Sequence, residues 1–316
     1  MNNETFLPVL KGLLSKFIGY KKKTPTSTGG TINSRYCYTV WLRHLIYASH
    51  SGYKHINTTV AELGPGDSLG TGLAALLCGC RHYYALDIFK YWDIERNLKI
   101  FDELVELFKQ RANIPGDIEF PRTTPKLDSY GFPSDILPEN ILQGSLSEER
   151  INKIRNELMH LEDEKDNAFI SCYVPWDDKT IIEKDTVDLF FSQAALQYVS
   201  ALENTYEAIK NLLKVGGIMS HSVDFSSHHL TKTWNGHWTF SEKEWELIKQ
   251  KTPAPLNRAS VTDHFKIIGK LNFKMTKIIK YPGPEGFVLK NFASPFKHLS
   301  TEACSTRAAF IQAIKQ

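Results

Sequence analysis

Residues 58–68 read TTVAELGPGDS, a short apolar run followed by a turn with two glycines. The apolar run predicts a β-strand, and Gly64 ends it. A helical pattern follows over residues 69–77, so the stretch is a strand, a glycine turn and a helix in succession. Glycines in such a turn let a ligand approach the backbone, and the helix N-terminus adds N–H groups with a partial positive charge. The stretch therefore predicts a ligand site at the carboxyl end of a strand.

The alternation of strands and helices continues after this turn. Apolar, strand-like runs follow at residues 82–88, 168–174, 187–192 and 218–223, and a helical pattern covers 195–213. Near-continuous apolar strands that alternate with helices predict a parallel sheet with helices on both faces. A short Pro/Gly turn at residues 282–286 joins two further strand-like runs, which predicts an antiparallel hairpin made of residues 274–281 and 286–292.

Two segments stand outside this alternation. Residues 35–50 carry apolar side chains at helical spacing, so residues 1–57 are predicted to form an N-terminal helical cap. Residues 113–165 contain several prolines and then a charged helical stretch, which predicts a cap insertion between the second and third strands. Residues 58–316 are then expected to form one Rossmann-like domain that carries this insertion.

Composition narrows the class of protein. The chain has 316 residues, of which 42% are hydrophobic and 23% charged, and its formal net charge is +3. These values predict a globular protein that does not bind nucleic acid. The five cysteines lack the paired spacing of a zinc site, which predicts reduced thiols in a cytoplasmic protein. No run is long and apolar enough to be a transmembrane segment, although the basic N-terminal segment could make weak peripheral contact with a membrane.

Acidic residues accompany the glycine turn at successive strand ends. Glu62 precedes the turn and suits an amino-bearing ligand better than a pyrophosphate. A dinucleotide site favours a third glycine at the position where Ser68 stands. Asp87 ends the second strand, where a carboxylate can accept both ribose hydroxyls of a nucleoside. Trp176 and Asp177 follow the third strand and could hold an adenine ring and its amino group.

The motifs ELGPGDS, LD at residues 86–87, DLFFSQAALQYV and LLKVGGIMSHSVDF resemble the successive motifs of class I S-adenosylmethionine-dependent methyltransferases, over about residues 58–225 with the insertion excepted. The resemblance implies a Rossmann-like α/β fold with a seven-stranded sheet, mostly parallel with the last strand antiparallel. It also implies S-adenosylmethionine as the cofactor. The residues then expected to bind the cofactor are Glu62, Gly64, Pro65, Gly66, Ser68, Asp87, Asp177, Ser192 and Gln193.

A narrower resemblance concerns the acceptor. Residues 35–44, 220–228, 235–238 and 257–258 resemble bacterial methyltransferases found with enzymes of polysaccharide and glycan assembly. Aromatic and amide side chains can stack on sugar rings and bond their hydroxyls, while an arginine can hold an anionic group. The residues expected to bind the substrate are Tyr38, Arg43, Asn235, His237, Trp238, Asn257 and Arg258.

Three side chains near the end of the fifth strand could supply acid–base chemistry: His221, Asp224 and His228. Methylation of a hydroxyl requires that a proton leave the oxygen, and a histidine can accept that proton at neutral pH. A neighbouring carboxylate can orient the ring. Two alternatives stay open, namely a divalent metal held by His221, Asp224 and a later histidine, and a purely structural cluster. No metal is predicted as the leading interpretation.

The leading functional hypothesis is O-methylation of a sugar or glycan in cell-surface polysaccharide synthesis. The acceptor could instead be a small natural product, which apolar residues in the insertion would favour. Two hypotheses of other classes are a nicotinamide-dependent oxidoreductase on a similar fold, which Glu62 and Ser68 disfavour, and a silent binding module.

Overall fold

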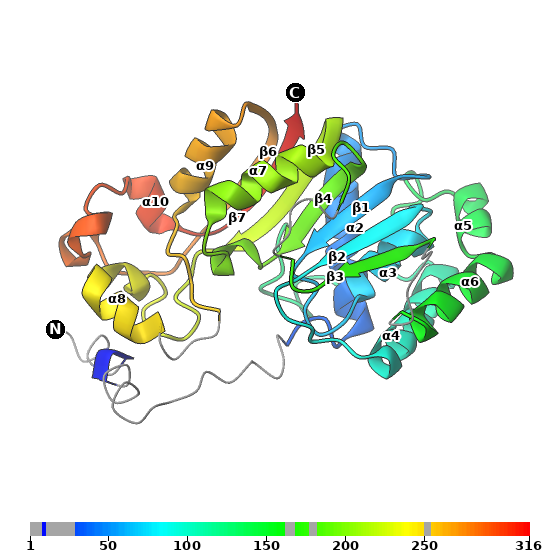
Figure 1. Cartoon of the computed structure of the whole chain (residues 1–316), viewed down its shortest axis with the longest axis horizontal. Helices are drawn as coiled ribbons and strands as arrows, with labels where there is room; N and C mark the ends of the chain where they lie inside the picture. The colour runs from blue at the N-terminus through cyan, green and yellow to red at the C-terminus, as the bar shows by residue number, and fades with distance from the viewer. Residues whose placement is uncertain (1–7, 11–28, 162–167, 177–181, 250–253) are drawn as a thin grey trace.

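The computed structural model describes residues 8–10, 29–161, 168–176, 182–249 and 254–316. One sheet of seven strands runs through the molecule in the order β3-β2-β1-β4-β5-β7-β6 (Figure 1). The strands are β1 (Thr59–Leu63), β2 (His82–Leu86), β3 (Ile170–Tyr173), β4 (Val187–Gln193), β5 (Leu213–Asp224), β6 (Phe273–Pro282) and β7 (Thr306–Lys315).

Strand direction confirms the predicted sheet. Strands β1 to β5 pair in parallel, and β7 is antiparallel to both of its neighbours, β5 and β6. The strand order reverses between β1 and β4, because the chain builds outward through β2 and β3 and then returns to the other side of β1. In open α/β sheets, such a switch point leaves a crevice at the carboxyl ends of the strands.

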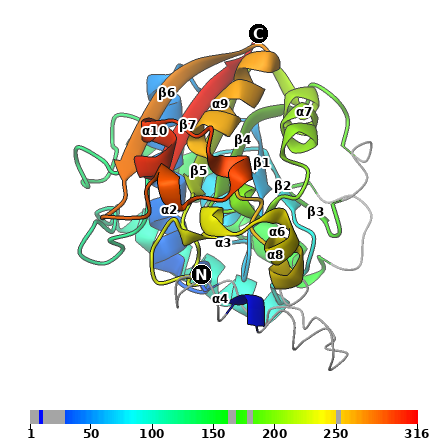
Figure 2. The same cartoon turned by 90° about the vertical axis from the view of Figure 1, so that its left-hand side faces the viewer.

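Helices cover both faces of the sheet. The helices α2 (Ser34–His50), α3 (Gly70–Leu77) and α4 (Ile94–Lys109) pack on one face and share its apolar core. The helices α7 (Leu202–Leu212) and α9 (Val261–Lys270) pack on the other (Figure 2). Side chains alternate along a strand, so Ala61 and Leu63 of β1 face α7, whereas Val60 and Glu62 face α3.

The predicted hairpin at residues 274–281 and 286–292 is wrong in its second strand. The first run forms β6, but residues 286–292 contain only a 3-10 turn, Leu289–Asn291, and Val288 is exposed. The antiparallel partner of β6 is β7, whose apolar run is buried between β5 and β6. A strand paired on both sides needs such a run, and the stretch around Val288 is too short and too polar to supply it.

Two further boundaries differ from the sequence predictions. The helix predicted over 195–213 is a 3-10 turn, η1 (Leu196–Tyr198), followed by α7, which begins only at Leu202. Ala194 adopts a left-handed φ of 53°, so the chain turns sharply after β4 and cannot continue directly into a helix. Gly216 and Gly217 lie within β5 rather than before it.

Residues 113–161 pack along the α2 side of the sheet and contain α5 (Glu139–Ser145) and α6 (Glu148–Met159). The carboxylate of Glu157 accepts hydrogen bonds from the backbone of Phe169 and Ile170, so α6 is held to the start of β3. Of the N-terminal segment before Gly29, only residues 8–10 are described, and Val9 packs against α8 (Glu242–Lys249). Every helix in the described ranges is too short or too polar to span a lipid bilayer.

Candidate functional site

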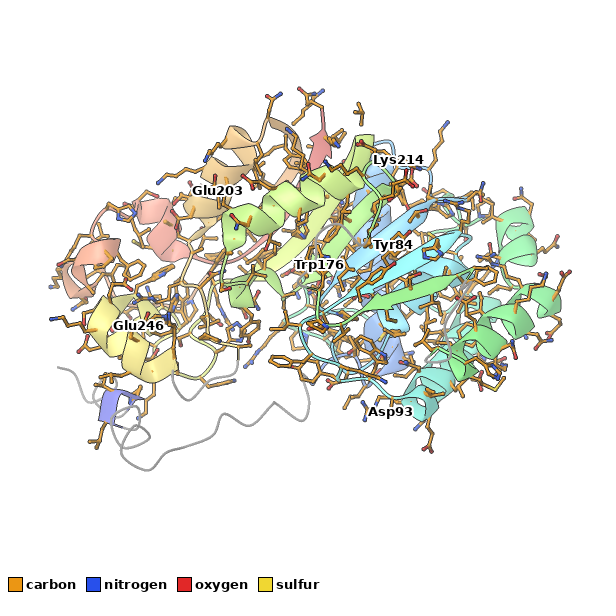
Figure 3. All side chains as sticks on the ribbon, viewed as in Figure 1. Tyr84, Asp93, Trp176, Glu203, Lys214 and Glu246 are labelled. Carbon is orange, nitrogen blue, oxygen red and sulfur yellow. The ribbon has the colours of Figure 1, made fainter. Side chains whose placement is uncertain are left out.

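A cavity of about 820 Å³ lies beyond the carboxyl ends of β1, β2 and β4, at the switch point of the sheet. Figure 3 shows Trp176, which lines this cavity, near the middle of the molecule where the chain leaves β3. The described residues that line it include residues of the turn after β1, the end of β2, η1, α7, the start of α2 and the segment that leads into it. The location matches the ligand site predicted from the glycine turn.

The turn after β1 forms one wall of the cavity. Gly64 and Gly66 have φ values of +75° and +74°, a region that favours glycine. A Cβ on Gly64 would lie 2.7 Å from the Cβ of Ala195, so a side chain there would also collide with the turn after β4. Pro65 lines the same wall, and its carbonyl accepts a hydrogen bond from the hydroxyl of Thr31.

Three successive backbone amides that lead into α3 already have partners. Those of Ser68, Leu69 and Gly70 donate to the side chains of Thr31, Asn97 and Ser68, at 3.1, 2.9 and 3.1 Å. A phosphate bound at a helix N-terminus depends on such free N–H groups. The Ser68 side chain is fully buried, donates to the Thr31 carbonyl and is not among the residues that line the cavity.

Two buried carboxylates line the cavity, and both belong to the predicted cofactor set. Glu62 is 2% exposed and accepts a hydrogen bond of 2.6 Å from the Tyr83 hydroxyl. Burial raises the pKa of Glu62 to about 8, against the lowering effect of its hydrogen bonds to Tyr83 and Thr71. Burial also raises the pKa of Asp87, whose Oδ1 accepts from the Ile88 amide at 2.7 Å. The cavity therefore contains two acceptor groups at the ends of neighbouring strands.

The end of β4 contributes Gln193 but not Ser192. Gln193 lines the cavity, and its Oε1 lies 3.3 Å from Nε2 of His44 on α2. The Ser192 side chain points to the opposite face of the sheet, where its hydroxyl lies 2.8 Å from Nδ1 of His221. Asp177 lies outside the described residues, whereas the neighbouring Trp176 lines the cavity.

The three predicted catalytic residues occupy different environments. His221 is fully buried between the rings of Phe190 and Tyr206, and burial lowers its pKa to about 3. A side chain with no access to solvent or to the cavity cannot take a proton from a bound acceptor. His228 lines the cavity, and Asp224 lies behind it with Oδ2 3.8 Å from the His228 Nε2.

Of the seven predicted substrate residues, Asn257 is half-buried and the others are buried, and their contacts hold the fold together. Arg43 is fully buried and donates to the carbonyls of Pro115, Thr123 and Pro125. The other predicted substrate residues that contact backbone are Tyr38, Asn235, Trp238, Asn257 and Arg258, which donate to the carbonyls of Ala112, Phe287, Arg258, Leu196 and Phe240, respectively. His237 is buried, and burial lowers its pKa to about 3. None of these seven is among the described residues that line the cavity.

Sequence reasoning missed several residues that do line the cavity. They are Thr31, Tyr36, Thr71, Tyr91, Gln197, Tyr198 and Asn204. Tyr36 lies two positions before the predicted Tyr38, on the other side of α2, and its ring faces the cavity whereas Tyr38 packs on Phe108. Helical spacing puts these two tyrosines on different sides of the helix. It could have shown which of them faces the cavity if the position of the sheet had been known.

Metal ligation finds no support in the described part of the chain. No group of three or more His, Cys, Asp or Glu side chains there could hold a metal ion. The five cysteines are free thiols, and Cys37, Cys78 and Cys80 are buried.

No protein-family model and no curated protein matches the chain. Solved structures with a similar arrangement include an S-adenosylmethionine-dependent methyltransferase from Mesorhizobium loti, 10% identical with a TM-score of 0.40, covering 87% of this chain and 99% of that one. Another is geranyl diphosphate C-methyltransferase from Streptomyces coelicolor A3(2), 11% identical with a TM-score of 0.43, covering 87% and 78%. A third is phosphoethanolamine N-methyltransferase 2 from Haemonchus contortus, 12% identical with a TM-score of 0.42, covering 90% and 57%. Similarity at this level does not place the chain in a family.

Proposed function

We propose that this chain is an S-adenosylmethionine-dependent methyltransferase whose cofactor binds in the cavity at the switch point of the sheet. When bound, S-adenosylmethionine supplies a methyl group on a positively charged sulfur. One observation carries the proposal: Glu62, the two left-handed glycines and Asp87 line a single cavity at the ends of β1 and β2. Asp87 would bind the ribose hydroxyls, Trp176 would lie against the adenine, and Glu62 would face the ammonium group.

A nicotinamide dinucleotide fits the same cavity less well. Its pyrophosphate would need free amides at the start of α3, and those of Ser68, Leu69 and Gly70, which lead into the helix, already donate to side chains. The buried carboxylate of Glu62, once ionised, would also repel a phosphate at that place.

The acceptor that we propose is a neutral compound with a hydroxyl group, of which a sugar or glycan end is one class and a small natural product another. The described residues that line the cavity include no lysine or arginine, so an acceptor phosphate would find no cationic partner among them. The insertion at 113–165 contributes none of these described lining residues. We assign the acceptor to the wall of the cavity formed by η1, α7 and His228.

Calorimetric titration with S-adenosylmethionine, S-adenosylhomocysteine and NAD tests the cofactor. We expect micromolar binding of the first two and none of NAD. Asp87→Ala should weaken binding at least tenfold, because about 1.5–3 kcal/mol is lost when a charged hydrogen-bond acceptor is removed. Asp102→Ala is the matched control, since Asp102 is exposed on α4 and pairs with Arg155 away from the cavity. Tight binding of NAD with no response to S-adenosylmethionine would overturn the proposal.

A further inference from the structure

The acceptor side of the cavity brings together two titratable side chains from separate elements. Tyr198 belongs to η1, directly after β4, and His228 follows the end of β5. Both line the cavity. The Tyr198 hydroxyl lies 3.0 Å from Nδ1 of His228, and the two ring centroids are 5.3 Å apart. Since β4 and β5 are neighbours in the sheet, the segments that follow them hold this pair at hydrogen-bonding distance.

The backbone that presents His228 is strained. His228 and His229 have successive left-handed φ values of 45° and 65°, which non-glycine residues seldom adopt. The preceding Ser227 fixes the turn, because its amide donates to the Trp234 carbonyl and its hydroxyl lies 3.3 Å from the Thr231 carbonyl. Strained residues held in this way concentrate at functional sites, where they orient a side chain that an ordinary turn would not.

Asp224 lies on the Nε2 side of the His228 ring. Its Oδ2 is 3.8 Å from Nε2, too far for a hydrogen bond, but its negative charge favours a hydrogen on that nitrogen. Nδ1 is then an acceptor, and the Tyr198 hydroxyl donates to it. The tyrosine oxygen keeps its lone pairs for a group bound in the cavity.

We infer that Tyr198 and His228 form a proton relay that deprotonates the acceptor, with Asp224 as the positioning residue. This rests on the methyltransferase function proposed above. As the acceptor oxygen bonds to the methyl carbon, the carbon–sulfur bond breaks and its electron pair stays on sulfur. The acceptor proton passes to the Tyr198 oxygen, and the Tyr198 proton passes to Nδ1 of His228. The resulting imidazolium is stabilised by Asp224, so charge and protons balance.

Several groups surround His228 and affect its basicity. Burial lowers its pKa, Asp224 opposes this shift, and His229 and Arg307 lower the pKa further. Burial raises the pKa of Tyr198 to about 12, so its hydroxyl stays protonated in the free protein. His237 also lies near enough for a mutual electrostatic effect, but its own pKa of about 3 keeps it neutral. A neutral His228 is therefore ready to accept a proton at pH 7 and above.

Nitrogen NMR of the full chain labelled with ¹⁵N-histidine, with S-adenosylhomocysteine as the probe, tests the relay without an acceptor. His228→Asn identifies the resonances, because asparagine tolerates the left-handed φ. We expect the Nε2–H tautomer, a lower His228 pKa in Asp224→Asn, and a shifted Nδ1 resonance in Tyr198→Phe. A hydrogen on Nδ1, or a His228 pKa that does not respond to Asp224→Asn, would overturn the inference. Cofactor titration reports separately on the proposed function, so the two can fail independently.

Kinetics on a hydroxyl compound that the wild type methylates gives the second readout. His228→Asn keeps an acceptor for the Tyr198 hydroxyl but cannot hold a proton, so kcat should fall about 10²–10⁴-fold while the affinity for S-adenosylmethionine is unchanged. Tyr198→Phe should behave alike. His298→Asn is the control, because its side chain is exposed and does not line the cavity. A full kcat in His228→Asn would contradict the relay.

Discussion

Two separate effects disfavour any residue other than glycine at position 64, and their costs in unfolding free energy can be measured separately. Its φ of +75° disfavours any side chain, and a Cβ would lie 2.7 Å from Ala195. Gly216 has a similar φ of +79° but nothing within 4 Å of its Cβ position. We therefore expect Gly216→Ala to cost about 1–2 kcal/mol of unfolding free energy from backbone strain alone, and Gly64→Ala to cost about 1–3 kcal/mol more from overpacking.

Urea unfolding of both glycine variants gives the two free energies, and calorimetry gives their affinities for S-adenosylmethionine. Only Gly64→Ala should weaken binding, because the displaced turn forms a wall of the cavity. Equal losses of stability in the two variants would show that the contact with Ala195 relaxes without cost.

Glu62 should make cofactor binding depend on pH. Burial raises its pKa to about 8, so the free protein carries this carboxyl mostly protonated at neutral pH. An ammonium group needs the ionised form, so affinity for S-adenosylmethionine should rise from pH 6 to 7.5, by up to about tenfold per pH unit. Glu62→Gln should remove this slope while leaving the hydrogen bond to Tyr83 possible. Titration calorimetry at several pH values measures it, and an unchanged slope in Glu62→Gln would contradict the assignment.

At the scale of elements, Arg43 ties α2 to the insertion. Its guanidinium donates to three backbone carbonyls and is fully buried, so a lysine cannot satisfy them all. We expect Arg43→Lys to lower the unfolding free energy by about 2–4 kcal/mol, because buried carbonyls lose their partners. On the same helix, Arg35 forms a half-exposed ion pair with Glu119 of the same segment. Arg35→Lys should cost less than about 1 kcal/mol.

Urea unfolding of the two arginine variants measures how much the contact between α2 and the insertion contributes to stability. A similarly small loss of unfolding free energy in both variants would mean that the insertion adds little to the stability of the sheet. The comparison is clean because both arginines lie on α2 and bond to residues 115–125.

The elements near the glycine turn could be predicted from sequence because their signals are local. The pattern of apolar strand, glycines and helix is complete within residues 58–77, and it matches β1 and α3. The pairing of β6 with β7 could not be predicted in this way, since the partner strand begins 24 residues after β6 ends and a closer apolar run competes with it. Short-range turn signals cannot decide between such partners.

The candidate site was predictable where its residues lie at the end of a strand or in the turn just after it. Glu62, Gly64, Gly66 and Asp87 do so, and all four line the cavity. For residues in the later loops, the sequence could not separate ligand binding from a structural role. A polar side chain that bonds to distant backbone has the same sequence pattern as one that faces a ligand. Asn235, for example, donates from its side-chain amide to the carbonyl of Phe287, 52 positions away, and its Oδ1 accepts from the backbone amide of the same residue.

At the scale of the whole molecule, the sheet divides the core into two compartments that meet at the cavity. The compartment under α2, α3 and α4 holds the glycine turn from one side, and the compartment under α7 and α9 holds η1 from the other. Both walls therefore depend on the packing of the entire sheet. Any condition that loosens either compartment should open the cavity as well, so global stability and cofactor affinity should fall together.

Acid should be such a condition, because the core contains several neutral histidines. Burial lowers the pKa of His44, His55, His221, His237 and His264 to about 3–4. In the unfolded chain these rings gain protons below about pH 6.5. The unfolded state then binds more protons than the folded state, so the free energy of unfolding should fall as pH drops from about 6.5 towards 4, by up to about 1.4 kcal/mol per histidine and pH unit. Glu62 acts in the opposite direction between about pH 4.5 and 8, and so do Asp87 and Glu157, whose pKa burial also raises, but these three carboxyls do not outweigh five imidazoles.

Urea unfolding at pH 7, 6 and 5 measures this slope, and His221→Asn separates the contribution of one ring. At pH 7 this variant should be less stable than the wild type, because it loses ring contacts with Phe190 and Tyr206. Its stability should nevertheless decline less steeply towards pH 5, since one buried base has been removed. His298→Asn is the control, because His298 is exposed, and it should follow the wild type at every pH. A slope in His221→Asn equal to that of the wild type would mean that His221 already accepts a proton in the folded state, which would restore it as a candidate base.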